Sequence, residues 1–513
     1  MLVKIKSGAS LGLEMVSVDV EVSVAKKGLP GFEIVGLPDK AVAESRERVK
    51  TAIQSSRIEF PTKKITVNLA PADLPKEGSC YDLPIAVAIV SAERGYSVPA
   101  KSLFFGELSL DGSLRHTKGV FLLALFAKEQ GFENIFVPKA SANEAVVIQG
   151  INVFPVESLN QLFRHLAGIE KIERAENGFP RSAGSRFAQT AEFDMREILG
   201  QEQAKRALEI SAAGGHNILM VGSPGAGKTM LARALPGILP PLTEAESLEV
   251  TKIYSAAGCI PPGGSLVKFP PFRSPHHSAS TVGLIGGGQR PHPGEISLAH
   301  RGVLFLDEFN EFPRPALEAL RQPLEDGCLT ISRSRERVRY PARFMLVASS
   351  NPCPCGYLHH PKKACICSPH QIRKYQKKIS GPILDRIDLH IEVPPVELKE
   401  LSENQRAVGF LESSCSIRER VIRARKIQQK RFLGETIFTN AEMKNEQIKK
   451  YCPLKREVEQ ILQQASQKFQ LSARSYLKMI KVARTIADLE EAPEIAPHHM
   501  AEALQYRFKN QEP

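Results

Sequence analysis

Alternating apolar and polar positions in the first third of the chain predict strands and helices in turn. Residues 17–24 read Ser-Val-Asp-Val-Glu-Val-Ser-Val, the period of two expected for a strand with one buried face. Residues 65–69 repeat this period, whereas residues 38–56 carry apolar side chains at the spacing of an amphipathic helix. We therefore expect a mixed α/β domain over residues 1–168.

Composition divides the rest of the chain into three blocks. Residues 169–190 are rich in Glu and Lys and then in Gly, Pro and Ser, which is typical of a linker. Apolar runs that end in glycine or acidic residues occupy residues 191–395, and a helical pattern fills residues 396–513. Because 513 residues suffice for about three domains, we predict an α/β module over 191–395 and a helical domain after it.

A strand pattern over residues 217–221 leads into a glycine-rich loop and then into a helix pattern. The loop has the spacing G-x-x-x-x-G-K-T of a phosphate-binding loop, whose glycines let backbone N–H groups turn inward around a triphosphate. Lys228 can reach the β- and γ-phosphates, and the Thr229 hydroxyl can ligate magnesium. The alternative is a glycine-rich turn before a core helix. The residues assigned to the nucleotide are Gly222, Ser223, Pro224, Gly225, Ala226, Gly227, Lys228, Thr229 and Met230.

A second apolar strand pattern, residues 303–306, ends in two adjacent carboxylates. Asp307 can hold the water shell of magnesium, and Glu308 can polarise the attacking water, a division of roles that suits ATPases with such a loop. A merely solvated strand end is the alternative. Together with the loop, this strand predicts ATP binding and hydrolysis with magnesium as cofactor.

Two further segments suit the same site. Residues 194–208 form a loop and helix just ahead of the phosphate-binding loop and can enclose adenine. Asn351 ends the strand pattern of residues 345–350, where it can orient the hydrolytic water. A turn residue ahead of Pro352 is the alternative for this asparagine.

Two arginines are candidates for contact with nucleotide. Arg386 lies on a helix-to-strand turn, from which it can enter a neighbouring subunit's site and stabilise transition-state charge. An ordinary ion pair with Asp385 or Asp388 is the alternative. Arg474 opens a later helix and can sense nucleotide from there, or it can be a solvated residue at a helix start.

Several of these segments resemble the ComM/YifB family of magnesium-chelatase-like AAA+ ATPases. The resemblance implies an N-terminal α/β domain of the ribosomal-S5/Lon-protease type, a central AAA+ module and a helical lid. It also implies a homo-hexameric ring that moves on single-stranded or branched DNA and promotes branch migration during recombination or natural transformation. The segments that carry the resemblance are residues 35–39, 217–230, 302–313, 351–356, 380–393 and 472–489.

A Lon-like domain raises the question of proteolysis. Residues 75–82 resemble the segment that carries the Lon nucleophile, with Cys80 in the place of the serine. The position of the lysine partner corresponds to Phe121, which cannot deprotonate a nucleophile. We therefore expect a non-proteolytic scaffold or a platform that contacts DNA.

A cysteine cluster follows Asn351. Four thiolates within fifteen positions can close a tetrahedral zinc site, which we expect to be structural. A group of reduced thiols in a loop is the alternative. The possible zinc ligands are Cys353, Cys355, Cys365 and Cys367, with His359, His360 and His370 as substitutes.

Residues 329–340 predict a hairpin between the two apolar strands that end in Asp307 and Asn351. Alternation along an unbroken strand would place four arginines on one face, although a turn must fall within the hairpin. Arginines suit contacts with the phosphates of DNA. A solvated charged hairpin is the alternative. The four candidates for DNA binding are Arg333, Arg335, Arg337 and Arg339.

Composition narrows the setting of these functions. The net charge of +12 suits a polyanionic partner such as DNA. Nine cysteines, four of them clustered, are unlike a secreted disulfide framework, and no apolar run is long enough to span a membrane. We expect a cytoplasmic protein without a membrane partner. A chelatase-type motor that remodels a protein partner for metal insertion is the alternative function.

Overall fold

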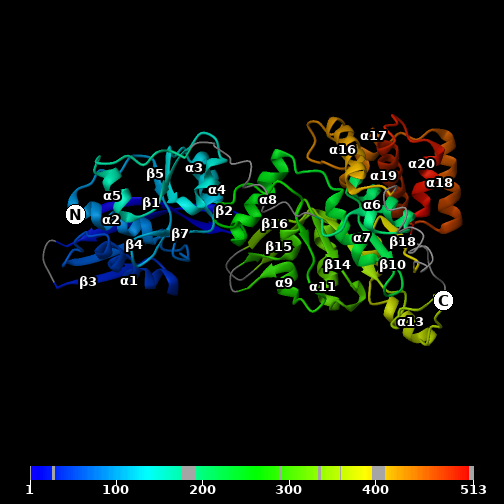
Figure 1. Ribbon diagram of the computed structural model, residues 1–513, viewed down its shortest axis with the longest axis horizontal. Coiled ribbons are helices and arrows are strands. Elements are labelled where there is room, and N and C mark those ends of the chain that lie inside the picture. The colour runs from blue at the N-terminus through cyan, green and yellow to red at the C-terminus, as the bar shows by residue number, and fades with distance from the viewer. Residues whose placement is uncertain are drawn as a thin grey trace. The chain divides into compact units, whose positions relative to one another are not determined.

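The computed structural model divides the chain into two compact units (Figure 1). One unit contains Met1–Phe187 together with Glu244–Val267, and the other contains Ala188–Thr243 together with Lys268–Pro513. The described residues are 2–25, 29–175, 191–288, 291–332, 337–358, 360–395 and 411–507.

The first unit is built on a seven-stranded mixed sheet in the order β3-β4-β2-β1-β5-β8-β9. Strands β1, β2 and β4 pair antiparallel, and the other pairings are parallel. The predicted strands over 17–24 and 65–69 lie within β2 and β4. The strands are β1 (Leu2–Leu11), β2 (Glu14–Val24), β3 (Gly31–Val35), β4 (Lys64–Ala70), β5 (Ser102–Phe104), β8 (Asn134–Pro138) and β9 (Asn152–Val156), with β6 (Glu107–Leu108) and β7 (Leu114–Arg115) as a separate small hairpin.

Helices cover both faces of this sheet. Phe104 belongs to the core that α1, α2 and α5 share, whereas its neighbours Leu103 and Phe105 belong to the core of α3 and α4. Successive residues of a strand point to opposite faces, so the two cores lie on opposite sides. The predicted helix over 38–56 is confirmed as α1. These helices are α1 (Lys40–Ser55), α2 (Asp82–Arg94), α3 (Val120–Glu129), α4 (Ala142–Val146) and α5 (Leu159–Leu166).

The helix α8 (Glu244–Ala257) belongs to the first unit although it interrupts the sequence of the second. The Ser255 hydroxyl donates to Glu144 Oε2 at 3.2 Å, and the N–H of Gly263 donates to the Ala140 carbonyl at 2.8 Å. The sequence did not predict that α8 joins the first unit, because the apolar pattern of a helix does not indicate which core its buried residues enter.

The second unit contains a five-stranded sheet in the order β11-β14-β17-β10-β18, and all its pairings are parallel. Parallel strands need crossover connections, which here contain helices and two small hairpins. The strands are β10 (Ile218–Val221), β11 (Phe272–Arg273), β14 (Val303–Leu306), β17 (Met345–Ser350) and β18 (Leu389–Glu392), and the hairpins are β12 (Gly286–Gly287) with β13 (His292–Pro293) and β15 (Cys328–Ser332) with β16 (Arg337–Pro341). The helices are α6 (Glu202–Gly214), α7 (Lys228–Ala234), α9 (Thr281–Ile285), α10 (Glu295–Leu298), α11 (Arg314–Ala319), α12 (Arg321–Asp326), α13 (Pro369–Gln376) and α14 (Gly381–Leu384).

The C-terminal region is helical, as the sequence predicts. Val421 and Ile486 are fully buried in the same core as Leu208 of α6 and Ile218 of the sheet. Among the described residues, no helix has both the length and the apolar content needed to cross a membrane. The C-terminal helices are α16 (Ser414–Arg431), α17 (Asn445–Tyr451), α18 (Arg456–Phe469), α19 (Ala473–Leu489) and α20 (Pro497–Gln505).

A buried charge on α19 gives a test of this packing. Asp488 is fully buried and binds Arg431 at 2.7 Å and Arg484 at 2.9 Å. Asp488→Asn leaves both guanidiniums without a counter-charge, so we expect the helical region to lose about 3 kcal/mol of stability. Calorimetric unfolding measures the loss. Glu494→Gln, which affects an exposed ion pair with Lys455, is the matched control and should change stability by less than about 0.5 kcal/mol. Equal effects of the two substitutions would contradict the prediction.

Candidate active site

The predicted phosphate-binding loop joins β10 to α7 within the parallel sheet. Gly225 and Gly227 have φ angles of +78° and +91°, in the left-handed region that favours glycine. A Cβ atom added at either glycine would meet no heavy atom within 4 Å, so the space beside them is open. The Ser223 hydroxyl is buried without a hydrogen-bond partner in the described part of the chain. An open glycine-rich cradle beside an unpaired hydroxyl fits a bound polyphosphate.

Lys228 is the first residue of α7 and is only 8% exposed. Its Nζ donates to the carbonyls of Gly222 at 2.6 Å and Ser223 at 2.9 Å, and to Asn351 Oδ1 at 3.2 Å. Burial lowers the pKa of the Lys228 amine from its ordinary value, and the carboxylates at the end of β14 oppose this shift. The amine is therefore held beside the loop by neutral oxygen atoms. Met230, two residues along, lies on the first turn of α7 and is 37% exposed.

Asp307 lies beside Thr229, as expected if both residues bind the same magnesium ion. The Thr229 hydroxyl donates to Asp307 Oδ2 at 2.8 Å. The other carboxylate oxygen, Oδ1, accepts from the Ser349 hydroxyl and from the N–H of Glu308 at 3.1 Å. These bonds fix the carboxylate plane. A hydroxyl and a carboxylate so arranged are the oxygen ligands that magnesium prefers, so the residues present fit that ion.

Glu308 turns the chain sharply after β14. Its φ of +52° lies in the left-handed region, which is uncommon for a residue with a side chain. The carboxylate is more than half exposed, and its Oε2 lies 3.3 Å from Nδ1 of His277. The accessible carboxylate can act as a general base, with an imidazole at ion-pair distance.

Arg386 and Arg474 share one carboxylate. Arg474 Nη2 donates to Glu325 Oε1 at 2.9 Å, and Arg386 donates to the other oxygen of the same group. The ion pair of Arg386 is therefore with Glu325 rather than with Asp385 or Asp388. Burial and neighbouring arginines lower the pKa of Arg386 from its ordinary value. Within the described residues, neither guanidinium forms a hydrogen bond with the phosphate-binding loop of its own chain.

The four clustered cysteines converge. Their sulfurs lie within 4.8 Å of one another, and Cys353 Sγ is 3.4 Å from Cys355 Sγ and 3.6 Å from Cys365 Sγ. A tetrahedral site with Zn–S bonds of about 2.3 Å has sulfurs about 3.8 Å apart, so the four thiols, Cys367 included, fit zinc. Hydrogen bonds from backbone N–H groups, that of Tyr357 first, lower the pKa of the Cys355 thiol to about 6. Of the proposed histidine substitutes, His360 and His370 do not belong to this group, and His359 lies outside the described residues.

The predicted arginine hairpin is formed by β15 and β16. Arg337 and Arg339 are exposed, whereas Val338 and Tyr340 are buried, so the alternation is confirmed for these two arginines. Arg333 and Arg335 lie outside the described residues.

The segment that resembles the Lon nucleophile lacks the chemistry of a protease in the described part of the chain. The Cys80 thiol donates to the Glu77 carbonyl at 3.5 Å, and burial raises its pKa above the ordinary value. Phe121 is fully buried in the core. A reactive thiol needs a lowered pKa and a basic partner, so this arrangement is inert.

Four residues of the site were not predicted from the sequence. Ser349 lies inside the strand pattern of residues 345–350, and its hydroxyl donates to Asp307. A polar residue in an otherwise apolar strand was the signal that could have identified it. His277 lies in a glycine-rich insertion that gave no reason to place it beside Glu308, and Glu325 lies in a segment without a motif. Asn310, in the short helix η5 (Phe309–Glu311), donates to the Tyr375 carbonyl at 3.0 Å, a contact that only the fold brings together.

Family comparisons cover most of the chain. Residues 194–401 match the family described as magnesium chelatase, subunit ChlI, and residues 411–507 match the C-terminal family of the same subunit. Residues 20–141 match the family described as subunit ChlI of Mg-chelatase.

Full-length relatives are more similar than the chelatase subunits. The uncharacterized protein YifB of Salmonella typhimurium is 44% identical over 97% of this chain and 96% of its own length. Competence protein ComM of Haemophilus influenzae is 43% identical over 98% of this chain and 96% of its own length. The magnesium-chelatase subunit ChlI of Euglena gracilis is 24% identical and aligns with 46% of this chain and 71% of its own length. The chain belongs to the ComM/YifB family of magnesium-chelatase-like AAA+ proteins.

Proposed function

We propose that this protein is an ATP-driven DNA motor of the ComM type, which assembles as a homo-hexamer and promotes branch migration during recombination or natural transformation. The convergence of Lys228, Asp307, Glu308 and Asn351 at one edge of the sheet carries the proposal. Support for DNA as the partner comes from the exposed arginines of β16, the net charge of +12 and the relative named a competence protein.

The nucleotide occupies the open glycine cradle in this proposal. Lys228 exchanges its neutral carbonyl partners for phosphate oxygens, a charge-assisted and therefore stronger interaction. Thr229 and Asp307 hold magnesium, which supplies positive charge to the phosphates. Glu308 takes the proton of the attacking water, and Asn351 orients that water.

The two arginines on Glu325 serve a neighbouring subunit. Both arginines bind Glu325 and not the phosphate-binding loop of their own chain, as far as the described residues show. One carboxylate balances only one of the two guanidinium charges, so a positive charge remains. A nucleotide on an adjacent subunit supplies anionic oxygens for Arg386 in the transition state, and Arg474 senses the same nucleotide.

The remaining assignments follow from the family. The N-terminal domain, residues 1–168, has the S5/Lon-protease type of fold and serves as a non-proteolytic platform in the cytoplasm. A linker over 169–190 leads to the AAA+ core over 191–395 and the lid over 396–513. A chelatase-type motor is not favoured, because the chelatase subunit of Euglena gracilis aligns with less than half of this chain.

A labelled four-way DNA junction tests the proposal. With ATP and magnesium, we expect the protein to convert the junction into duplex products and DNA to stimulate ATP turnover. Lys228→Ala should abolish conversion because nucleotide binding is lost. Glu308→Gln should retain ATP binding and assembly while turnover falls by about 100-fold or more, since the general base is removed. Failure of every DNA shape to stimulate turnover would leave the chelatase-type function ahead.

Mixed rings test the role of Arg386. Arg386→Ala alone should lower ATP turnover by about 100-fold or more because the transition state loses a charge. Mixing it with Lys228→Ala should restore part of the turnover, since each subunit supplies what its neighbour lacks. Arg423→Ala, which breaks an exposed ion pair with Glu491, is the control and should have no effect. Absence of recovery in mixed rings would indicate that the Glu325 ion pairs are only structural.

Elemental analysis tests zinc. We expect one zinc per chain, bound by the four clustered cysteines, and loss of the metal in the double variant Cys365→Ser with Cys367→Ser. Cys415→Ser, at an exposed cysteine outside the cluster, is the matched control and should keep the metal. Metal-free wild-type protein, purified without chelator, would contradict the prediction.

A further inference from the structure

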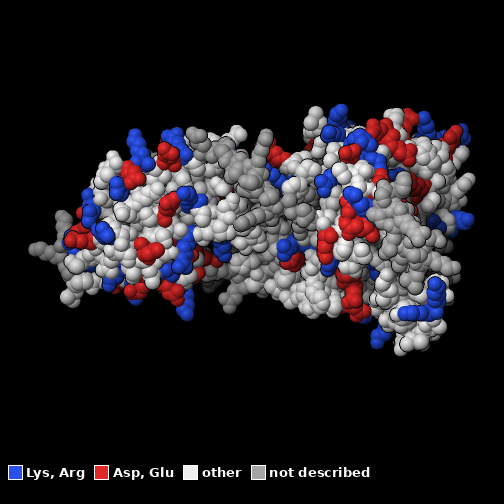
Figure 2. All heavy atoms as spheres, in the orientation of Figure 1, with Lys and Arg blue, Asp and Glu red and all other residues white. Residues whose placement is uncertain are grey.

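The segment between the strand end at Asn351 and Leu384 has an extreme charge. Its 34 residues contain six Lys or Arg and no Asp or Glu, so it carries half of the net charge of +12. A polybasic stretch without compensation attracts polyanions. On the face shown in Figure 2, the lobe around α13 carries Lys and Arg and no acidic side chains.

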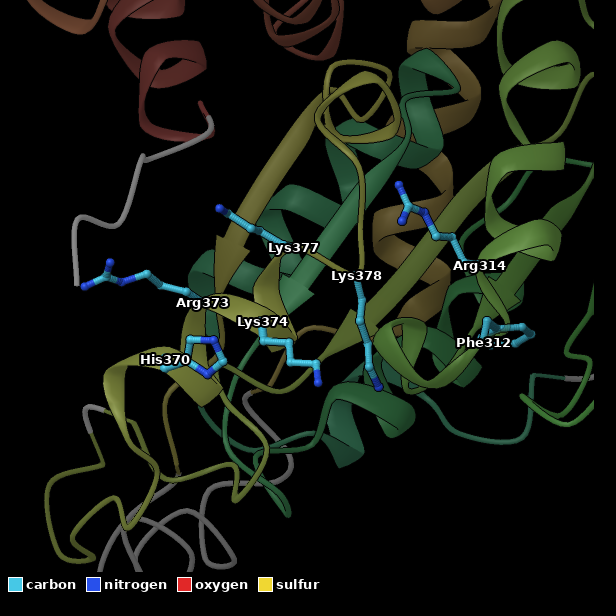
Figure 3. Close-up of a pocket in the computed structure, with 7 residues that line it drawn as sticks. All are labelled: Phe312, Arg314, His370, Arg373, Lys374, Lys377 and Lys378. Atoms are coloured by element: carbon cyan, nitrogen blue, oxygen red, sulfur yellow. The ribbon is translucent and has the colours of Figure 1, made fainter.

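The helix α13 presents much of this charge outward. Ile372 and Tyr375 are buried and anchor the helix, and Ser368 caps its N-terminus. Arg373 and Lys374 are exposed on α13, and Lys377 and Lys378 are exposed in the turn that follows it, four residues after each. Figure 3 shows these two pairs pointing in different directions, with Lys374 and Lys378 aimed the same way.

A pocket of about 600 Å³ lies beside this helix (Figure 3). Lys378 binds Glu311 at 3.1 Å, but Arg314, Arg373, Lys374 and Lys377 have no carboxylate partner within the described residues. Phosphate oxygens would supply the missing negative charge. The lining residues are Phe312, Arg314, His370, Arg373, Lys374, Lys377 and Lys378.

The pocket is joined to the catalytic turn by short contacts. Asn310, two residues after Glu308, donates to the Tyr375 carbonyl of α13 at 3.0 Å and accepts from the Ser350 hydroxyl. Glu311 binds Lys378 of the pocket. A ligand that moves α13 therefore also moves Asn310, which lies after β14 and Glu308 and which binds Ser350 at the end of β17, next to Asn351.

We propose that this pocket binds the sugar–phosphate backbone of DNA and that Asn310 conveys its occupancy to Glu308. This inference rests on the proposed DNA motor and names a contact surface separate from the β16 arginines. Cations dominate the lining of the pocket, where Phe312 is 4% exposed and the imidazole ring of His370 is exposed. Contacts of cations with phosphates and stacking of a ring on a base both tolerate any base sequence. Binding is therefore independent of base sequence and steeply dependent on salt.

Charge removal tests the pocket. In the triple variant Arg373→Ala, Lys374→Ala and Lys377→Ala, affinity for a labelled single-stranded oligonucleotide should fall by about 10-fold or more. The slope of log affinity against log salt should shrink by about 2 to 3, since each lost phosphate contact releases one counterion fewer. The matched control removes three exposed lysines of the C-terminal helices, Lys426, Lys430 and Lys449, and should bind like wild type.

The outcomes separate this inference from the proposed function. If wild type binds DNA and the triple variant binds equally well, the pocket is not the site, while the DNA motor stands. If wild type binds no DNA, the proposed function fails first. Displacement of the oligonucleotide by millimolar inorganic phosphate at constant ionic strength would overturn backbone binding in favour of a discrete phosphate site. Thermal unfolding of the triple variant verifies its fold.

A second variant tests the connection to catalysis. Asn310→Ala should keep the DNA affinity of wild type but reduce the ratio of ATP turnover with DNA to turnover without it by about fivefold or more. A merely structural role would change both turnover rates together and leave the ratio intact. An unchanged ratio would overturn the role of Asn310.

Discussion

The backbone hydrogen bonds of β17 to β10 on one side and to β14 on the other determine the geometry of the candidate active site. Because these three strands are parallel, their carboxyl ends meet at one edge of the sheet. The three turns that follow carry Lys228, Asp307 and Asn351, which are distant in sequence. A shift of register along β17 would separate these turns, so the strand pairing itself positions the chemistry.

The same strand also connects the ATP site to the basic segment. Asn351 leads directly into the cysteine cluster, where a Cβ at Gly356 would lie 2.5 Å from Pro224 of the phosphate-binding loop. The segment then returns through α13, whose Tyr375 accepts a hydrogen bond from Asn310, two residues after Glu308. A four-thiol cluster holding a metal would stiffen the first part of this path. Displacement of the basic helix could then act on the site through packed contacts rather than through flexible linkers.

The sequence predicted those features of the site that depend on local pattern. The glycine loop, the carboxylates after β14 and the strand end at Asn351 each have a short motif, and the structure brings all three together. It could not predict Glu325, because nothing local marks a carboxylate that two distant arginines share. The joining of α8 to the first unit was missed for the same reason. Such contacts depend on tertiary packing, and they include Asn310 with Tyr375.

The Glu325 cluster bears on why a ring would be required. Two guanidiniums around one carboxylate carry one positive charge more than that carboxylate balances. Burial, together with the neighbouring Arg474 and Arg321, lowers the pKa of Arg386 from its ordinary value. A single carboxylate is enough to hold both arginines in position before assembly. An anionic group from outside the chain would complete the balance. In the proposed ring, nucleotide bound by a neighbouring subunit is such a group, and the excess positive charge beside Glu325 suits that proposal.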